Sequence, residues 1–490
     1  MSANPQTADN DSAEAWFARG RALLEAKRNQ EALNAFDEAQ LRRPDWAELE
    51  FPHYDAAWRA LYDSVNTSDW RWYDYLQRLV VSRIRRGHTF VGETALASPY
   101  MDGAVQLTGA RNFCTAYANT PRPFSHRRPG PKIRLGFVGA DFHQQATAYL
   151  LTGVIEQFDR SRFELRAYDF GPNPGGKLRE RSLQAYDAVI PIHDLSDQQA
   201  AERIHADGID VLFHMRGLAN GKIGVFAYRP AAIQIHYLYF PGSSGADCID
   251  YILADDFVIP PGLESNYAER VLRLPGCYQP NDSRRSLPSA RRRADFGISE
   301  EAVVLANFSQ NYKISPDVFA LWCRLLLADR RRVLWLLSRD PVVQANLRRE
   351  AVHHGVHPQR LLFGPALNTD DHLARLRASD LVLDTYPYGG HTLTSDALWA
   401  GTPVVTMIGT TFASRVAGSL LRAVGLERLA TNNPDQYLAV ADALARQPEE
   451  RQRIRAALDA GRSSFELFSS AAYARKFERL LLDLVANRWP

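Results

Sequence analysis

Near the start of the chain, after a polar stretch of twelve residues, apolar positions recur at helical spacing. Residues 13–46 place large and small residues at the positions of one 34-residue helix–turn–helix repeat, which a proline closes. No second copy follows, and a lone repeat cannot bury its own apolar face. We therefore predict one tetratricopeptide repeat that docks onto later helices; a plain amphipathic helix pair is the alternative. The matching residues are Trp16, Gly20, Leu23, Ala32, Phe36, Ala39 and Pro44.

The stretches around this repeat have different compositions. Residues 1–12 are polar and lack the basic start and apolar centre of a signal peptide, so we expect a flexible tail. Residues 47–125 are aromatic-rich and predicted to be helical. Residues 120–132 combine proline with basic side chains, which is typical of a linker into a new domain.

Beyond the linker, short β-rich apolar runs alternate with helical stretches. This alternation predicts an α/β fold with parallel sheets. The runs form two blocks, residues 131–290 and 300–490, separated by a polar and basic stretch at 281–301. We predict two Rossmann-like lobes, the second with closing helices, and a ligand cleft beyond the carboxyl ends of the strands. The runs lie at 133–139, 163–170, 188–192, 209–215, 232–238, 250–255, 302–308, 332–337, 360–364, 380–385 and 403–407.

Composition narrows the functional classes. Lysine and arginine total 58 against 56 acidic residues, a net charge of +2, which argues against a nucleic-acid partner. No uncharged apolar run is long enough to span a membrane. Four cysteines are scattered without metal-ligand spacing, which indicates neither a disulfide framework nor a zinc site. We expect a location in the reducing cytoplasm.

The strongest local signal lies at residues 384–407, where a buried strand, a turn and a helix follow one another. Gly389 and Gly390 belong to the turn, and the helix is predicted to begin near Thr392. Free backbone N–H groups at such a helix terminus bind anions, and glycine lets a phosphate approach the backbone. Asp396, in the first turns, is placed to hydrogen-bond a ribose. A well-capped structural helix is the alternative, because a strand, glycine turn and helix alone are weak evidence.

Two other strands end at residues that carry candidate chemistry. Gln310 and Lys313 follow the strand at 302–308. A lysine at this position is able to neutralise a diphosphate, and the alternative is an ordinary solvated lysine. Asp141 follows the strand at 133–139 and is a candidate proton acceptor. The residues alone favour a helix cap for Asp141.

Arginine clusters elsewhere in the chain suggest surface positions. The pairs and triplets at 284–285, 291–293 and 330–332 are predicted to be solvated linker and helix ends. The only strict Asp-x-Asp sequence lies at residues 9–11, in the expected tail. The sequence therefore offers no motif for a metal-dependent sugar-nucleotide site.

Read together, these segments resemble the protein O-linked N-acetylglucosamine transferase family, from about Asp69 to the end of the chain. The resemblance rests on NFSQNYKI, D-T-x-P-x-x-G-H-T, D-x-L-W-A-G-T-P-V-V-T-M and ASRVAGSLL, which occur in register. It implies a fold of the GT-B type, with two Rossmann-like lobes. It also implies inverting, metal-independent transfer of N-acetylglucosamine from UDP-N-acetylglucosamine to serine or threonine hydroxyls of proteins. No cofactor is expected, and the family's tetratricopeptide repeats help to capture the acceptor protein.

The resemblance also implies roles for individual residues. Lys313 matches the lysine that stabilises the departing diphosphate, and Asp141 matches the aspartate proposed to take the acceptor's proton. The remaining matches are donor-binding positions. Gln310 is a donor contact, His372 and Arg375 lie near the uracil, His391 and Thr392 form the phosphate-binding helix terminus, and Asp396 holds the ribose.

Departures from the family pattern, three of them at positions 145, 239 and 393, leave the donor sugar and the rate open. Gln145 stands where a histidine is common, Leu393 where a threonine is frequent, and Tyr239 where a glycine is usual. One alternative is therefore a glycosyltransferase that uses another nucleotide sugar, or an asparagine, flagellin-type or adhesin acceptor. The other is a catalytically weakened binding module that presents partners through its helical start.

Overall fold

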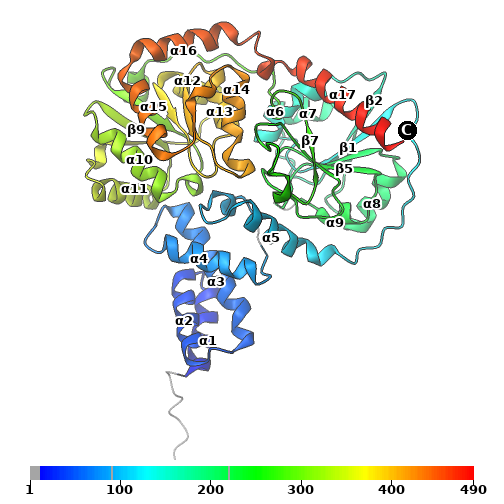
Figure 1. Ribbon diagram of the computed structural model, residues 1–490, viewed down its shortest axis with the longest axis horizontal. Coiled ribbons are helices and arrows are strands. Elements are labelled where there is room, and N and C mark those ends of the chain that lie inside the picture. Colours follow the sequence, from blue (N-terminus) through cyan, green and yellow to red (C-terminus); the bar gives the residue numbers. More distant parts are fainter. Residues whose placement is uncertain (1–11, 90–91, 219–220, 490) are drawn as a thin grey trace, which may run out of the picture.

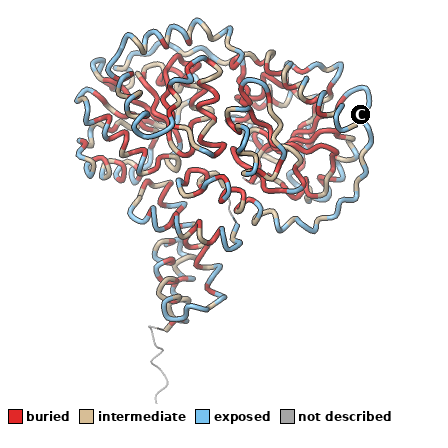
Figure 2. Tube along the Cα trace, in the orientation of Figure 1, coloured by how far each residue is buried: buried red, intermediate tan, exposed pale blue. Residues whose placement is uncertain are grey.

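A computed structural model describes residues 12–89, 92–218 and 221–489, so the predicted tail lies outside the described residues except for Ser12. A helical segment leads into two α/β lobes that lie side by side (Figure 1). The predicted fold class, two Rossmann-like lobes of the GT-B type after a helical start, is confirmed. Figure 2 shows a buried core in each lobe, with exposed residues concentrated on the outer helices and on the helical segment.

The helical segment starts with two antiparallel helices that pack through a glycine. The Ser12 hydroxyl caps the first helix by accepting a hydrogen bond from the backbone N–H of Ala15. Gly20 lets the Phe36 ring approach so closely that a Cβ at this position would lie 2.4 Å from the ring. The predicted helix pair is thus present, and its assignment as a tetratricopeptide repeat stays a prediction. The helices of the segment are α1 (Ala13–Glu25), α2 (Asn29–Arg42), α3 (Glu50–Thr67), α4 (Tyr73–Arg85) and α5 (Gly103–Cys114).

This segment is braced against both lobes. Trp70 packs on Phe319 of the second lobe, with the ring centroids 5.5 Å apart. The side-chain amide of Asn346 donates a hydrogen bond to the Thr67 carbonyl. On the other side, the Cys114 thiol donates to the Ser244 carbonyl in the first lobe. The helical segment is therefore packed against both lobes and is not a detached arm.

The first lobe is a seven-stranded parallel sheet in the order β3-β2-β1-β4-β5-β6-β7. Its central strand β1 pairs with β2 and β4 in parallel register and is almost entirely buried, as expected for a sheet covered on both faces. The elements are β1 (Ile133–Gly139), α6 (Ala146–Ile155), β2 (Phe163–Asp169), α7 (Lys177–Gln184), β3 (Ala188–Pro191), α8 (Asp197–Ala206), β4 (Val211–His214), α9 (Ile223–Ala227), β5 (Ile233–His236), β6 (Tyr251–Ala254) and β7 (Arg270–Arg273).

The second lobe is a six-stranded parallel sheet in the order β10-β9-β8-β11-β12-β13. Its order reverses between β8 and β11, the kind of switch point at which ligands bind in open α/β sheets. The elements are β8 (Val303–Asn307), α10 (Pro316–Leu327), β9 (Arg332–Leu337), α11 (Pro341–His353), β10 (Leu361–Gly364), α12 (Thr369–Ala378), β11 (Leu381–Leu383), α13 (Thr392–Trp399), β12 (Val404–Met407), α14 (Val416–Ala423), β13 (Ala430–Thr431), α15 (Pro434–Arg446) and α16 (Pro448–Gly461).

The final helix returns to the first lobe. Helix α17 (Ser470–Arg488), red in Figure 1, crosses from the second lobe and lies on the first. Its fully buried Phe477 packs edge-on against Phe158 and Phe213 and at a tilt against Tyr237. The Tyr473 hydroxyl lies 2.6 Å from that of Tyr237. The core of the first lobe is therefore completed by residues that follow the whole second lobe in the chain.

Candidate functional site

A cleft of about 350 Å³ lies where the two lobes and the helical segment meet. The start of α6, residues 145–147, faces it from the first lobe, together with Tyr239 and Gln279. The second lobe contributes the stretch after β8, Tyr388, and residues 390–393 at the start of α13, and Glu93 enters from the helical segment. Of the predicted site residues, Gln310, Lys313, His391 and Thr392 line this cleft, as do Gln145, Tyr239 and Leu393, the departures from the family pattern.

Lys313 supplies the positive charge of the cleft. It ends a short 3₁₀ helix, Asn311–Lys313, and its ammonium donates a hydrogen bond to the Gly389 carbonyl at 3.2 Å. The same ammonium lies 3.5 Å from the centre of the Tyr388 ring. Burial lowers the pKa of Lys313 to about 8, although the carboxylates of Asp384 and Glu93 favour its charged form. Lys313 is therefore a fixed cation at neutral pH and one that is close to titrating.

The N-terminus of α13 faces the same cleft. No side chain caps this helix, so the first-turn N–H groups keep their donor capacity. Asp384 fixes the preceding turn by accepting a 2.6 Å hydrogen bond from the Gly390 N–H, and burial raises the pKa of this carboxyl to about 6. His391 donates from Nε2 to the Ala413 carbonyl, and burial lowers its pKa to about 3. His391 is thus neutral, and the helix end presents N–H groups to an anion.

Asp396 sits deeper in α13, in a cluster of charged groups. It forms an ion pair with Arg285, and its other oxygen lies 3.5 Å from His372 Nε2. Burial acts to raise the pKa of Asp396, but Arg285 and His372 hold it below its usual value. Arg375 donates a 3.0 Å hydrogen bond to His372 Nδ1, so the three predicted base-and-ribose contacts form one network.

This network meets the cleft through an aromatic ring. The Arg375 guanidinium lies 4.0 Å from the centre of the Phe308 ring, and His372 meets the same ring edge-on. Phe308 lines the cleft, whereas Asp396 does not. The structure therefore brings the predicted donor-binding residues together in two layers, with the predicted phosphate-binding residues at the cleft and the predicted base-and-ribose contacts behind Phe308.

Asp141 is placed beside the cleft and not in it. The carboxylate is 6% exposed and lines a small neighbouring pocket. Its Oδ2 lies 3.5 Å from Arg216 Nε, and Arg216 in turn donates to the hydroxyl of Tyr239, which lines the cleft. Burial raises the pKa of Asp141. The helix-cap interpretation is wrong, because α6 begins after Gln145, four residues further on.

The prediction that the arginine clusters are solvated is wrong for two members. The side chain of Arg285 is only 8% exposed, because it forms an ion pair with the carboxylate of Asp396. Arg332 is fully buried and pairs with Asp442 at 2.7 Å. Both partners lie about a hundred residues further along the chain, so local sequence carries no signal for either pair.

Two further cleft residues carry polar atoms that need a ligand. Gln279 is 2% exposed, and its side-chain Nε2 has no hydrogen-bond partner in the described structure. The buried Ser309 hydroxyl is also without one. Unpaired buried polar groups are costly, so such groups in a cleft indicate a polar occupant. With Lys313 and the α13 terminus, the cleft suits a ligand with several anionic oxygens.

Within residues 12–89, 92–218 and 221–489, no group of three or more His, Cys, Asp or Glu side chains is placed to hold a metal ion. Over the same ranges, no helix is both long enough and apolar enough to cross a membrane.

Comparison with known proteins matches the predicted resemblance. The UDP-N-acetylglucosamine–peptide N-acetylglucosaminyltransferase of Caenorhabditis elegans is 25% identical over 474 residues, covering 74% of this chain and 41% of its own. The Arabidopsis thaliana protein named "Probable UDP-N-acetylglucosamine--peptide N-acetylglucosaminyltransferase SEC" is 31% identical over 373 residues, covering 73% of this chain and 38% of its own. The chain thus spans about two fifths of the length of these curated relatives.

A solved structure extends the similarity to nearly the whole chain. A lysine-to-methionine mutant of the Thermobaculum terrenum O-GlcNAc transferase superposes with a TM-score of 0.77 at 26% identity. The match covers 99% of this chain and 92% of that one. The model of glycosyl transferase family 41 matches residues 115–294 and 281–477, which include both lobes and every predicted site residue. The chain belongs to glycosyl transferase family 41.

Proposed function

We propose that this chain transfers N-acetylglucosamine from UDP-N-acetylglucosamine to serine or threonine hydroxyls of proteins, with inversion and without a metal ion. One observation carries the proposal: the Lys313 ammonium and the uncapped N-terminus of α13 meet in one cleft. UDP is a good leaving group only when preorganised donors neutralise its growing charge. A fixed cation and a helix terminus supply that neutralisation from protein groups alone. The names of the similar proteins support the choice of donor and acceptor.

The two layers of the site are proposed to bind different parts of the donor. Lys313, Gln310, His391 and Thr392 are assigned to the diphosphate and sugar, because they line the cleft. The network around Asp396 is assigned to the uridine, because it offers a carboxylate for a ribose hydroxyl and lies beside the Phe308 ring. Asp141 remains a predicted proton acceptor, and it is linked to the cleft through Arg216 and Tyr239.

A second candidate is a glycosyltransferase with a different nucleotide sugar. Gln145, Tyr239 and Leu393 all face the cleft, where they shape the space for the sugar. Titration with UDP-N-acetylglucosamine, UDP-galactose, UDP-glucose and GDP-fucose in a thermal-shift assay separates the candidates. The largest stabilisation identifies the donor, a response to GDP-fucose alone contradicts the first candidate, and no response to any of the four compounds contradicts both.

UDP is expected to stabilise the chain without a divalent cation, because Lys313 and the α13 terminus already balance its charge. At UDP concentrations 100-fold above the dissociation constant, the free energy of unfolding rises by about 2.7 kcal/mol. Thermal unfolding with UDP, in EDTA and in added magnesium, measures this. A stabilisation that disappears in EDTA contradicts the metal-free proposal.

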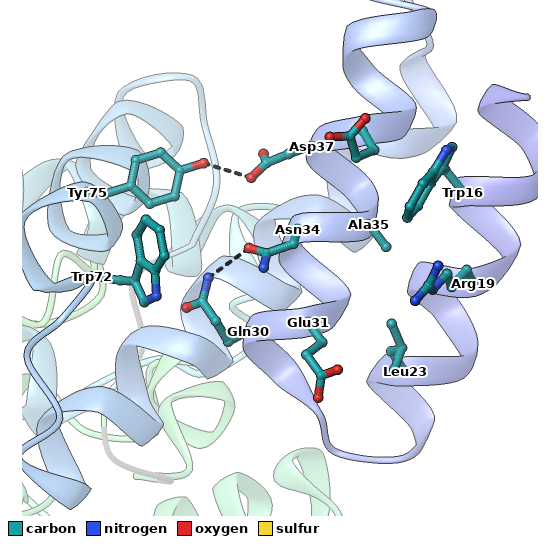
Figure 3. A pocket seen from close by; sticks show the side chains of 11 residues that line it. Trp16, Arg19, Leu23, Gln30, Glu31, Asn34, Ala35, Asp37, Trp72 and Tyr75 are labelled. Atoms are coloured by element: carbon teal, nitrogen blue, oxygen red, sulfur yellow. Dashed lines mark hydrogen bonds between the residues drawn. The ribbon is translucent and has the colours of Figure 1, made fainter. Parts of the chain in front are cut away.

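A second hollow, of about 620 Å³, is the proposed place for the acceptor protein. It lies on the helical segment, with Trp16 on α1, Asn34 and Asp37 on α2, and Trp72 and Tyr75 at the start of α4 (Figure 3). The Tyr75 hydroxyl donates a hydrogen bond to the Asp37 carboxylate, and this bond holds the Tyr75 ring in place. A surface that combines exposed aromatic rings with amides and carboxylates suits an extended peptide.

Trp72→Ala is expected to raise KM for a protein acceptor about tenfold and to leave UDP affinity unchanged. Trp72 is 53% exposed at the hollow, and aromatic anchors of this kind often contribute more than 1 kcal/mol to binding. Leu41→Ala is the matched control, since Leu41 is exposed on α2 outside the hollow. Equal losses of UDP binding and acceptor binding would show that the helices only brace the lobes.

We further propose that the protein acts in a reducing compartment, the cytoplasm. All four cysteines are free, at positions 114, 248, 277 and 323. Burial raises the pKa of each thiol to about 12, which keeps these side chains unreactive.

A further inference from the structure

The cleft between the lobes receives one carboxylate from outside them. Glu93 opens a short 3₁₀ helix, Glu93–Ala97, in the helical segment, and it lines the cleft with Lys313, Gln310 and Thr392. Among the described residues that line this cleft, Glu93 is the only aspartate or glutamate. An enzyme that moves a sugar to a hydroxyl needs a group that takes the hydroxyl's proton.

The other titratable groups of the cleft are poor proton acceptors. His391 is neutral, but burial lowers its pKa to about 3, and Nε2 is already bonded to the Ala413 carbonyl. Lys313 carries a proton at neutral pH. The tyrosines hold their protons, because burial raises the pKa of Tyr239, Tyr312 and Tyr388 well above the usual value. Gln145 cannot titrate.

The surroundings hold the Glu93 side chain in place. The Tyr312 hydroxyl donates to Glu93 Oε2 at 3.3 Å, and Tyr239 lies against the same carboxylate. The Lys313 ammonium, whose charged form Glu93 favours, is the nearest cation in the cleft. Asp141 is a like charge close by, but it pairs with Arg216. A carboxylate fixed by tyrosine hydroxyls, near a lysine, is preorganised as a base.

We propose that Glu93 is the catalytic base of the transfer, an assignment that rests on the proposed function. The acceptor's hydroxyl oxygen bonds to the anomeric carbon while the bond from that carbon to the diphosphate oxygen breaks. The hydroxyl proton passes to a Glu93 oxygen, and UDP leaves with its new charge against Lys313 and the α13 terminus. Glu93 returns the proton to solvent when the products depart. The helical segment thereby contributes a reacting group, in addition to its surface.

The test compares Glu93→Gln with Asp141→Asn in the full chain. The assay measures transfer from labelled UDP-N-acetylglucosamine to a pool of synthetic peptides that each contain one serine or threonine, over a range of pH. We expect Glu93→Gln to lower kcat by about 10²–10⁴ and to remove the fall in kcat/KM toward acidic pH. UDP affinity and thermal midpoint should stay at their wild-type values, since glutamine keeps the shape and the Tyr312 contact. Glu48→Gln, an exposed carboxylate of the same segment, is the matched control and should behave as wild type.

Three outcomes contradict the assignment, and they can be told apart. Wild-type turnover in Glu93→Gln, with the acidic limb intact, overturns Glu93 alone. Loss of the acidic limb in Asp141→Asn but not in Glu93→Gln moves the base to Asp141. No transfer by the wild-type chain to any peptide, despite UDP binding, overturns the proposed function and with it the role of Glu93.

Discussion

Lys313→Ala lowers the rate of sugar transfer by about 10²–10³, because the ammonium interacts most strongly with the diphosphate when its charge develops. The substitution removes one hydrogen bond to the Gly389 carbonyl and one contact with the buried Tyr388 ring, and Lys313 itself lies outside both sheets. The fold should therefore survive, with a small loss of UDP affinity. Single-turnover transfer and UDP titration measure the two effects separately. Unchanged turnover would refute the assignment of the cleft as an active site.

The same lysine sets the alkaline limit of activity. Its pKa of about 8 means that the free enzyme loses this charge as pH rises through about 8, so kcat/KM should fall there. Bound diphosphate favours the protonated lysine, so the fall in kcat should come at higher pH. Lys313→Arg keeps the charge at every accessible pH. In this variant the alkaline fall should move beyond the measured range, whereas an unmoved limb would assign it to another group.

Asp396→Ala lowers the free energy of unfolding by about 3–5 kcal/mol, because it leaves the buried Arg285 guanidinium without its counter-charge. UDP affinity should fall as well, since the proposed contact between Asp396 and the ribose is lost. Urea unfolding and UDP titration give the two quantities. The control is the double variant Arg285→Leu with Asp396→Leu, which removes both charges. It should recover most of the stability and none of the UDP affinity.

A different result would revise the picture of this cluster. If Arg285→Leu alone were as stable as wild type and bound UDP normally, Arg285 would be incidental to the site. If the double variant bound UDP as well as wild type, Asp396 would have no part in donor binding.

Much of the fold was predictable because the parallel strands are buried on both faces. Each of the eleven predicted apolar runs contains a strand, and β1 and β9 match their predicted bounds. Strands β7 and β13 were missed for physical reasons. Strand β7 reads Arg-Val-Leu-Arg at a sheet edge and is only partly buried, and β13 has two residues. Neither is long or apolar enough to stand out from a loop.

The candidate site was predictable where its residues lie close together in sequence. Gly389 and Gly390 mark the turn between Asp384 and Thr392, and the segment with Lys313 directly follows a buried strand. Helix α13 begins at the predicted residue. Glu93, Arg285 and Gln279 were missed because tertiary packing alone brings them to the site. Glu93 lies 219 residues from its Tyr312 neighbour in the sequence, and Arg285 lies in a stretch whose composition is that of a linker. No local pattern distinguishes such residues from surface charges.

The return of α17 to the first lobe has a consequence for the order in which the protein is made. The first sheet leaves the ribosome well before Phe477 and Tyr473, the residues that seal its core. At about 5–20 residues per second, the roughly 200 residues between β7 and α17 take on the order of 10–40 s to synthesise. During that time the nascent first lobe exposes the apolar surface around Phe158 and Phe213. The first lobe therefore completes its core only after the second lobe has been made, and the nascent chain is a natural client for chaperones until α17 has emerged.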